Sequence, residues 1–467
     1  MIRRKPLVIY ALLAVGVAVL IAALAMPAIL AQPAHGEAMR DLAIYISSRR
    51  KPGDASPALI PIIRDELAAA FHAANPAPGM DFALLSDLLA GAWDDPSAAP
   101  GRETLARLRP AIDAALVRLD QARFSPDALD PLDPDILGKA LWTSSSAACR
   151  SVVLYAALPS MRESANNGDW PRVVAISRTM LRLADAELSC PLVVAGLVRG
   201  SYRTAVCIEL RRLATETEMP EEAAVALIGL LASGEHDASW LADIAEGEQK
   251  YTLASLDTMY ASGGLALTWV RDRAEKYWDS PPFGLPGQQQ PPSVRERLGN
   301  LRALAMPRRA SSEAALRAHH ARLTEWVRRM DPAAPVPSIE EVAPGNSMLT
   351  EPGGVPLSIS GSWRFLVTNM LFERRATIAA LRLRAHRAAH GRWPSSLADA
   401  APSDEQTDPL TGHKFNFRQG EENAPPALAT ASMLLPETSR TFFPAARPRL
   451  SLFPLREPSP DDADEDE

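Results

Sequence analysis

Apolar residues recur at spacings of three and four along residues 37–279, a period that is typical of amphipathic helices and predicts an α-helical domain. The pattern is clearest over residues 104–119, where Leu105, Leu108 and Ile112 fall on one helical face. Pro, Gly and Asn separate one apolar stretch from the next, as expected at helix ends. The predicted helices cover residues 59–75, 80–93, 104–119, 136–162, 170–187, 191–215, 221–231 and 239–260.

One pair of these helices is joined by the turn Asn167-Gly168-Asp169-Trp170. The turn resembles a single helical hairpin of the tetratricopeptide kind. A solenoid needs about three copies of its repeat, and no second copy occurs at a period of about 34 residues. The sequence therefore favours an irregular α-helical domain over a repeat array.

Two stretches interrupt the helical pattern after residue 279. Residues 280–293 form a Pro- and Gln-rich loop, and residues 332–361 form a linker rich in Pro, Gly and Ser. Between them, residues 294–331 are strongly charged and predict a helical segment. The last residues, 457–467, form an acidic tail that we expect to be disordered.

Residues 362–456 predict a small α+β unit. Residues 362–389 are expected to form one long amphipathic helix, closed by Gly391 as its C-cap. A strand follows, in which Phe415 and Phe417 share one side because side chains alternate along a strand. An apolar helix face needs a covering surface, so we expect a short antiparallel sheet to pack on this helix. The other apolar side chains expected there are Phe442, Phe443, Leu450, Leu452 and Leu455.

The N-terminus combines a basic flank with an uncharged apolar run. Residues 1–6 hold Arg3, Arg4 and Lys5, and residues 7–31 form the apolar stretch. About 20 apolar residues span a bilayer, whereas the apolar part of a cleavable signal is about 7–15 residues long. We therefore expect an uncleaved transmembrane helix with its basic flank in the cytoplasm and the body on the other side. Cleavage near the end of the stretch is the alternative.

Two turn motifs follow the predicted long helix: Gly391-Arg392-Trp393-Pro394, and Asp408-Pro409 with Gly412. Their order resembles the region after the long helix of type II secretion pseudopilins, which implies a helix-to-sheet fold. The assembly motif of that family, Gly-Phe-Thr-Leu-x-Glu, is absent beside the anchor. Residues 427–449, where the family's calcium loop would fall, contain Glu437 as their only carboxylate. The resemblance therefore implies a fold and no calcium site.

Three further features are the Gly168-Asp169-Trp170 turn, the helical Glu246-Gly247-Glu248 and the C-terminal Leu452-Phe453-Pro454-Leu455. Together with the anchor, their order resembles a set of uncharacterised bacterial membrane-anchored proteins that is common in planctomycetes. That set has no known activity, so the resemblance implies an architecture only. It implies a single-pass protein of the bacterial inner membrane with a periplasmic body. The fold expected is mainly α: an N-terminal transmembrane helix, an irregular helical body, and a small C-terminal unit of one long helix plus a short antiparallel sheet.

Composition narrows the function classes. The chain of 467 residues has a net charge of −7, which argues against a nucleic-acid partner, because such proteins need a concentrated basic face. Arg far outnumbers Lys, which we interpret as codon bias. Cys149, Cys190 and Cys207 lie in apolar helical stretches at spacings that fit no zinc ribbon. We expect buried free thiols, with one disulfide as the alternative in an oxidising compartment.

The histidines offer the nearest approach to a metal site. His386 and His390 lie four residues apart on a helix, so both side chains can face one ion, and His413 is the nearest third ligand along the chain. No Glu lies between them in the pattern of a zinc protease, so we expect a structural pair without metal. His319 and His320 are adjacent and are expected to point to different faces of their helix.

The remaining chemical patterns are interpreted as structural. Ser48 and Lys51 fit Ser-x-x-Lys, but the partner motifs Ser-Asp-Asn and Lys-Thr-Gly are missing. The sequence also lacks Gly-x-Ser-x-Gly, a Walker loop and Gly-x-Gly-x-x-Gly. Paired carboxylates turn away from each other on a helix and indicate a solvated face or a cap. These pairs are Glu246 with Glu248 and Asp94 with Asp95. We therefore expect no catalytic residue, no cofactor and no metal.

The leading hypothesis is a membrane-tethered, extracytoplasmic helical scaffold that binds a protein partner in the envelope and no nucleic acid. One alternative is an envelope hydrolase whose active-site residues are dispersed along the sequence. The other is a pseudopilin-like component of a secretion or pilus system. A compact pocket with converging His or carboxylate groups would favour the enzyme, and broad grooves without such a cluster would favour the scaffold.

Overall fold

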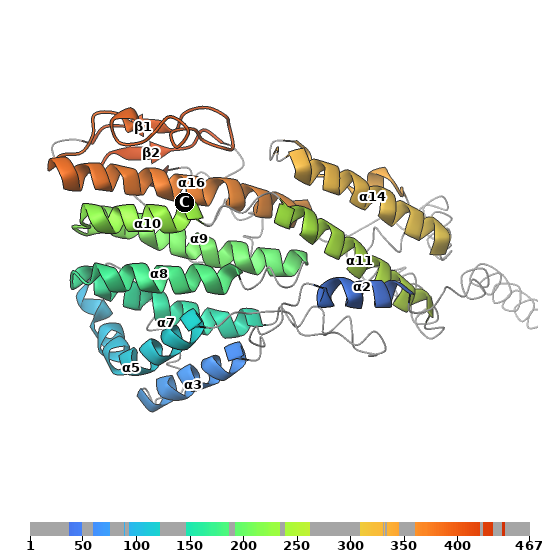
Figure 1. Cartoon of the computed structure of the whole chain (residues 1–467), viewed down its shortest axis with the longest axis horizontal. Coiled ribbons are helices and arrows are strands. Elements are labelled where there is room, and N and C mark those ends of the chain that lie inside the picture. Colours follow the sequence, from blue (N-terminus) through green and yellow to red (C-terminus); the bar gives the residue numbers. More distant parts are fainter. Residues whose placement is uncertain are drawn as a thin grey trace, which may run out of the picture.

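Helices dominate the described part of the chain, and a small antiparallel sheet accompanies them (Figure 1). Within the ranges that this computed structural model describes, no helix is both long and apolar enough to cross a bilayer. The predicted anchor, residues 7–31, and the predicted tail, residues 457–467, lie outside those ranges. The structure describes residues 37–48, 59–74, 88, 93–121, 146–185, 192–233, 239–261, 309–329, 331, 334–344, 360–420, 424–432 and 441–443.

The elements follow one another as helices until the sheet near the C-terminus. The α-helices are α2 (Glu37–Ser47), α3 (Leu59–Ala74), α5 (Ala99–Gln121), α7 (Ser146–Asn166), α8 (Trp170–Asp185), α9 (Val193–Glu216), α10 (Glu221–Ser233), α11 (Ser239–Ala261), α14 (Arg309–Arg329) and α16 (Ser360–His390). Short 3-10 helices are η1 (Pro96–Ala98), η3 (Ile339–Glu341) and η4 (Leu397–Asp399). The strands are β1 (Asn416–Arg418), β2 (Ala427–Ala429) and β3 (Thr441–Phe443).

The predicted helices are confirmed wherever the structure describes them, and their ends are set by caps. Helix α5 begins before residue 104 because the side chain of Asp95 accepts a hydrogen bond from Ser97 N–H at 2.8 Å and starts η1 ahead of it. The predicted hairpin of α7 and α8 is confirmed as well. Its turn uses Gly168 at φ 74°, and Asp169 caps α8 by accepting from Arg172 N–H at 3.2 Å. The helix predicted over residues 80–93 lies largely outside the described residues.

The helices stack in successive layers (Figure 1). Helix α16 packs against α9 and α10, these contact α8, and α7, α5 and α3 follow on the other side of α8. The sheet lies on the face of α16 that points away from α10. Helices α2, α11 and α14 form the opposite end of the molecule, where α2 and α14 both pack on α11.

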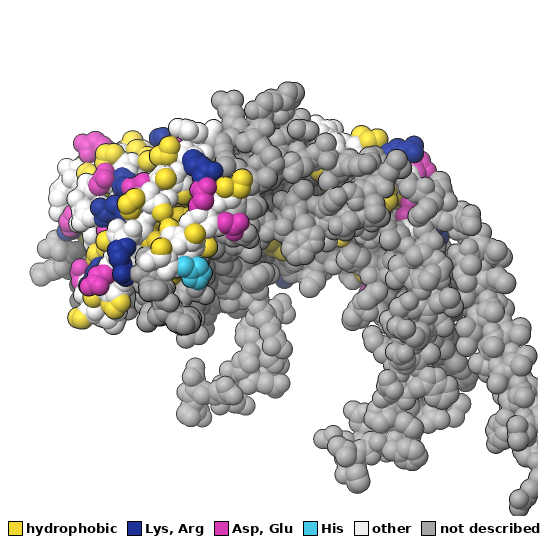
Figure 2. Space-filling model, turned by 90° about the horizontal axis from the view of Figure 1, so that it is seen from below, with side chains coloured by type: hydrophobic (Ala, Val, Ile, Leu, Met, Phe, Trp, Pro, Cys, Tyr) yellow, Lys and Arg dark blue, Asp and Glu magenta, His cyan; other side chains and the backbone are white. Residues whose placement is uncertain are grey.

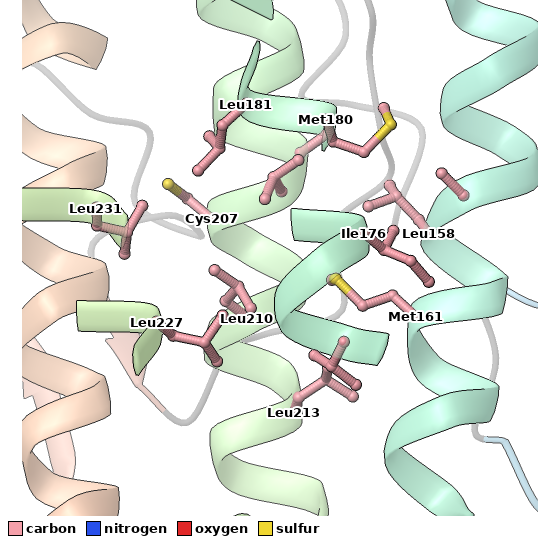
Figure 3. Close-up of a cluster of buried hydrophobic side chains, with 14 of the residues drawn as sticks. Leu158, Met161, Ile176, Met180, Leu181, Cys207, Leu210, Leu213, Leu227 and Leu231 are labelled. Carbon is pink, nitrogen blue, oxygen red and sulfur yellow. The ribbon is translucent and has the colours of Figure 1, made fainter. Parts of the chain in front are cut away.

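One hydrophobic core runs through these layers and joins residues of the predicted body to residues of the predicted C-terminal unit. Figure 3 shows its centre, where Met161 and Ile176 approach each other between α7 and α8. Such interlocking of large side chains is the main favourable contribution to the stability of a helical layer. The residues drawn include Leu158, Met180, Leu181, Cys207, Leu210, Leu213, Leu227 and Leu231.

Helix α16 corrects one prediction. A one-sided apolar stripe was expected, but Ile378 and the following residues through Leu381, together with Leu383, are all at most 4% exposed. Burial on all sides follows from the position of the helix between the α9–α10 layer and the sheet. The basic residue Arg384 is also buried, and it pairs with Glu218 at 2.6 Å.

The sheet predicted to cover this helix is confirmed. Its order is β1-β2-β3, all antiparallel, with Phe417 opposite Leu428. Phe415 is buried, and its ring meets the ring of Phe372 edge to face with centroids 6.3 Å apart. Asp408 holds the turn before β1 by accepting from Leu410 N–H at 2.9 Å and from the hydroxyl of Thr430. The predicted apolar segment with Leu450, Leu452 and Leu455 lies outside the described residues.

Candidate functional site

A set of buried polar groups lies on α11 and α14 in the described chain. Thr252 on α11 and His320 on α14 are 0% and 2% exposed, and Thr252 Oγ1 lies 3.0 Å from His320 Nε2. The hydroxyl of Thr252 donates to the backbone carbonyl of Glu248 at 2.9 Å. Its oxygen therefore accepts from Nε2–H of His320, which assigns the tautomer of that ring.

Glu248 lies one turn before Thr252 on the same face of α11 and caps a different helix. Its Oε2 accepts from Val193 N–H, the first residue of α9, at 3.2 Å. The N-cap residue of α9 is Leu192, whose side chain has no acceptor, so the carboxylate supplies the missing cap from across the interface. Burial raises the pKa of Glu248 to about 7, against the opposing effect of the hydrogen bond from Val193.

The two adjacent histidines face different neighbours, as predicted. Burial, with a smaller contribution from His319, lowers the pKa of His320 to about 3. Burial also lowers the pKa of His319, which lies beside Ser338 and Glu341. No described residue provides a hydrogen-bond partner for Nδ1 of either ring. Both imidazoles therefore enter this interface neutral, and protonating either one costs free energy.

An ion pair closes the other end of the interface. Asp257 near the end of α11 is 1% exposed, and it accepts from Arg309 Nε at the start of α14 at 2.9 Å. The guanidinium also reaches Glu313 Oε2 at 3.0 Å. A buried carboxylate requires such a partner, because an unpaired charge in this position costs several kcal/mol.

These groups join α11 to α9 and to α14, and they are poorly placed for catalysis. A carboxyl group with a pKa near 7 beside a hydroxyl and an imidazole is the kind of group that serves as a general acid or base in enzymes. A substrate would have to reach the groups, yet the most exposed of Glu248, Thr252 and His320 is 7% exposed. The arrangement therefore places groups with oppositely shifted pKa values on the two sides of α11, Glu248 against α9 and His320 against Thr252.

An open groove of about 390 Å³ lies on the other side of α14, against the segment after η3. Three of its lining residues, Ala314, Ala315 and Ala318, are small side chains at helical spacing. Small side chains let another backbone approach closely. None of the residues that line this groove carries a titratable side chain. The others are Ser311, Val342, Ala343 and Pro344.

The structure places the predicted histidine pair at the C-terminal end of α16. The rings of His386 and His390 stack with centroids 4.2 Å apart and an interplanar angle of 21°. His413 is exposed in the turn before β1. In the part of the chain that the structure describes, no three His, Cys, Asp or Glu side chains converge in a way that could hold a metal ion.

The other singled-out residues have structural partners. Ser48 donates to the carbonyl of Tyr45 at 2.7 Å, and Lys51 lies outside the described residues. Glu246 is 52% exposed and pairs with Lys250, whereas Glu248 is buried, so the two carboxylates do turn away from each other. Cys207 is a buried free thiol, as predicted, and burial raises its pKa. The side chains of Cys149 and Cys190 lie outside the part of the chain that the structure describes.

Sequence reasoning missed Glu248, Thr252 and His320 as interface groups. One signal was present, because Glu248 lies four residues after Ile244 and three before Tyr251, within the stripe of α11 that is buried. The partner atom, Val193 N–H, is 55 residues away in the chain, and no local pattern connects the two.

Neither a protein-family model, nor a curated protein, nor a solved structure matches this chain. The assignment of function therefore depends on the geometry described above.

Proposed function

We propose that this chain is a membrane-tethered helical scaffold on the extracytoplasmic side of a bacterial membrane, where its body binds a protein partner. The groove on α14 is the observation that carries the proposal. Its described lining is small, mainly apolar and without a titratable side chain, which suits an apolar face of a partner helix. By contrast, the titratable groups between α11 and α14 are enclosed.

The surface supports a protein partner over a nucleic acid. Figure 2 shows the face formed by α3 and α5, where basic, acidic and hydrophobic side chains are interspersed on the part that is described. Ion pairs such as Arg118 with Glu66 join opposite charges between these helices. A nucleic-acid interface would gather basic side chains on one face, because each phosphate contact needs a cation.

The tether would determine which end of the body lies near the membrane. Helix α2 begins at Glu37, shortly after the predicted anchor at residues 7–31, and it packs on α11 through Leu42 and Ile46. The end formed by α2, α11 and α14 is therefore expected to lie next to the bilayer, with the sheet farther away (Figure 1). A reporter enzyme that works only outside the cytoplasm, fused after Glu467, should be active. Activity only of a cytoplasmic reporter would reverse this topology.

Photo-crosslinking tests the scaffold itself. A photoreactive amino acid at Ala315, in the groove, should capture a defined partner when cells are irradiated and membranes are extracted. The matched control is Val117 on α5, which is 55% exposed and far from α14 in the fold (Figure 1). Filling the groove with Ala318→Trp should abolish the adduct at Ala315. Identical adducts at both positions, or an adduct unchanged by Ala318→Trp, would show that the groove is not the surface that binds the partner.

A second candidate function is a pseudopilin-like component, and one observation favours it. The long helix α16 is followed by the Asp408 turn and by an antiparallel sheet that packs back on the helix, the arrangement that the resemblance implies. The missing assembly motif beside the anchor favours the scaffold. Crosslinked oligomers of this chain with pilin-type subunits, rather than a single partner, would support this second candidate.

A further inference from the structure

A short segment lies along α14 and forms one wall of its groove. We call residues 334–344 the strap; they include η3 (Ile339–Glu341), which contacts α14. At one end of the strap, Trp326 Nε1 on α14 donates to the carbonyl of Ala334 at 3.2 Å. At the other end, residues 342–344 line the groove together with small side chains of α14. Any displacement of the strap from the helix therefore removes a wall of the groove.

Few interactions hold the strap in place. Of its residues, all of which the structure describes, only Ala343 is buried. Glu341 pairs with Arg322 of α14 at 3.3 Å, but both side chains are more than half exposed, and such ion pairs contribute little. The hydrogen bond from Val342 N–H to Ile339 O at 3.1 Å closes a single 3-10 turn, which is unstable without packing. The strap can therefore detach from α14 without unfolding the helix.

His319 on α14 faces the strap. Its ring forms a hydrogen bond with the backbone of Ser338 and lies near Glu341. The residue is 7% exposed, and its Nδ1 has no hydrogen-bond partner among the described residues. A neutral imidazole leaves one nitrogen without a proton, whereas an imidazolium carries N–H on both nitrogens. Protonation would therefore bury a positive charge together with an N–H that has no acceptor at Nδ1.

The surroundings of His319 disfavour its positive charge while the strap is bound. Burial has the largest effect and lowers the pKa of His319 below its ordinary value of 6.5. Glu341 of the strap opposes this shift, and Arg322 of α14 adds to it. With the strap released, the ring is in water and regains its ordinary pKa. The bound state therefore holds a proton more weakly than the released state does, so acidification below pH 6.5 favours release.

Other titratable groups on the helices packed here are engaged elsewhere. His320 stays neutral over this range, because burial, with a smaller contribution from His319, lowers its pKa to about 3. On α11, Glu248 accepts from Val193 N–H of α9, and Asp257 is paired with Arg309. His319 is therefore the histidine whose charge bears on the strap between pH 8 and pH 5.

We propose that the strap is an acid-sensitive wall of the groove: protonation of His319 releases it from α14, and the groove then holds its partner less tightly. Protonation of buried histidines displaces packed segments in pH-sensing proteins by the same physical rule. The release of the strap is a property of this chain alone. Its effect on partner binding rests on the proposed scaffold function.

Hydrogen exchange with mass spectrometry, on the purified full chain in detergent, tests the release. From pH 8 to pH 5, protection of the amides in residues 334–344, corrected for intrinsic exchange, should fall several-fold. The fall should be at most about thirtyfold, the limit set by a released imidazole with a pKa of about 6.5. Amides of α14 should change little over the same range. His319→Gln keeps a hydrogen-bonding side chain without a titratable group, and it should make strap protection independent of pH. Glu341→Gln should steepen the response, because it removes the carboxylate that opposes release.

The matched control is His413→Gln, which removes an exposed histidine from another part of the chain and should follow the native curve. Strap protection that is equal at pH 8 and pH 5 in the native chain, or that falls equally in His319→Gln, would overturn the proposal. A fall that the α14 amides share would also overturn it, because opening of the whole helix interface would then explain the exchange.

Photo-crosslinking from Ala315 in isolated membranes tests the consequence for binding. The adduct should be weaker at pH 5 than at pH 8 in the native background and equal at the two pH values with His319→Gln. An adduct in the native background that is as strong at pH 5 as at pH 8 would show that the strap does not control the groove. Absence of any adduct would instead count against the scaffold function, and the exchange data would still decide whether the strap is released.

Discussion

Acidification should act in two opposite directions on the packing of α11, through Glu248 against α9 and through His320 on α14. Burial raises the pKa of Glu248 to about 7 from an ordinary value of 4.5, and it lowers the pKa of His320 to about 3 from 6.5. The folded chain therefore holds a proton at Glu248 more tightly than the unfolded chain does, and at His320 it holds one more weakly. The Glu248 contribution to the free energy of unfolding falls as the pH rises from 4.5 through 7. The His320 contribution falls as the pH drops below 6.5 toward 3.

The two contributions nearly offset each other in the native chain. Linkage between about pH 8 and about pH 5 gives a gain of about 2–3 kcal/mol from Glu248 and a loss of about 2 kcal/mol from His320. Substituting one of the two residues leaves the pH-dependent contribution of the other uncompensated. Glu248→Gln keeps an acceptor for Val193 N–H, and His320→Gln keeps a donor for Thr252, so both variants preserve the hydrogen bonds while removing the titration.

Hydrogen exchange of the α9 and α14 amides measures this difference. Between pH 8 and pH 5, protection corrected for intrinsic exchange should fall roughly thirtyfold in Glu248→Gln and rise by a similar factor in His320→Gln, because about 1.4 kcal/mol corresponds to a factor of ten. The native chain should change little by comparison. Glu246→Gln, which alters an exposed carboxylate on the same helix, is the control and should follow the native curve.

Other groups titrate over this range, but they do so in every variant. His319 is present throughout, so the differences between the curves isolate Glu248 and His320. Parallel pH curves for the native chain, Glu248→Gln and His320→Gln would refute the reasoning. That result would mean that the two groups titrate alike in the folded and unfolded chains.

Three further predictions concern the core. Glu209→Leu should destabilise by about 3–5 kcal/mol in urea denaturation because it leaves Arg162 charged and 1% exposed, and adding Arg162→Met should recover most of the loss. Gly196→Ala should destabilise by about 1–2 kcal/mol because its Cβ would lie 2.8 Å from Ile244 Cδ1, whereas Gly229→Ala, with open space around it, should stabilise by about 0.5–1 kcal/mol. Phe415→Ala should lower the free energy of unfolding by about 3–5 kcal/mol. In limited proteolysis of this variant, the sheet should be cleaved at lower protease concentrations than α16.

The helices of the body were predictable because their apolar spacing coincides with the buried faces. Leu105, Leu108 and Ile112 on α5 are all buried, as the period of the sequence requires. The element ends were less predictable. The start of α5 before residue 104 was missed although Asp94 and Asp95 had been interpreted as a possible cap, because the cap at Asp95 acts through η1 rather than on the helix directly.

The long C-terminal helix shows where periodicity fails. An arginine such as Arg384 normally indicates a solvent-facing position, and the prediction of an amphipathic helix followed from that assumption. In the fold, Arg384 donates from Nε to the carbonyl of Met219 at 3.2 Å and pairs with Glu218, so its charge is satisfied while its stem is buried. Only the position of α10 beside α16 makes this possible, and a single sequence does not contain that information.

The excess of Arg over Lys was interpreted as codon bias, but in the fold the arginines also have a structural role. Buried or partly buried arginines join helices that lie far apart in the chain, and their planar forks match carboxylates with two parallel hydrogen bonds, as Arg162 does with Glu209 at 2.7 and 2.6 Å. Sliding one helix along another would leave such a charge buried without its partner, at a cost of several kcal/mol. A uniformly aliphatic interface built from many Ala and Leu side chains imposes a much weaker penalty on the same shift. We therefore infer that the ion pairs select the register of an alanine-rich helical stack. The pairs that do so are Arg162–Glu209 between α7 and α9, Arg211–Glu373 between α9 and α16, and Arg309–Asp257 between α11 and α14.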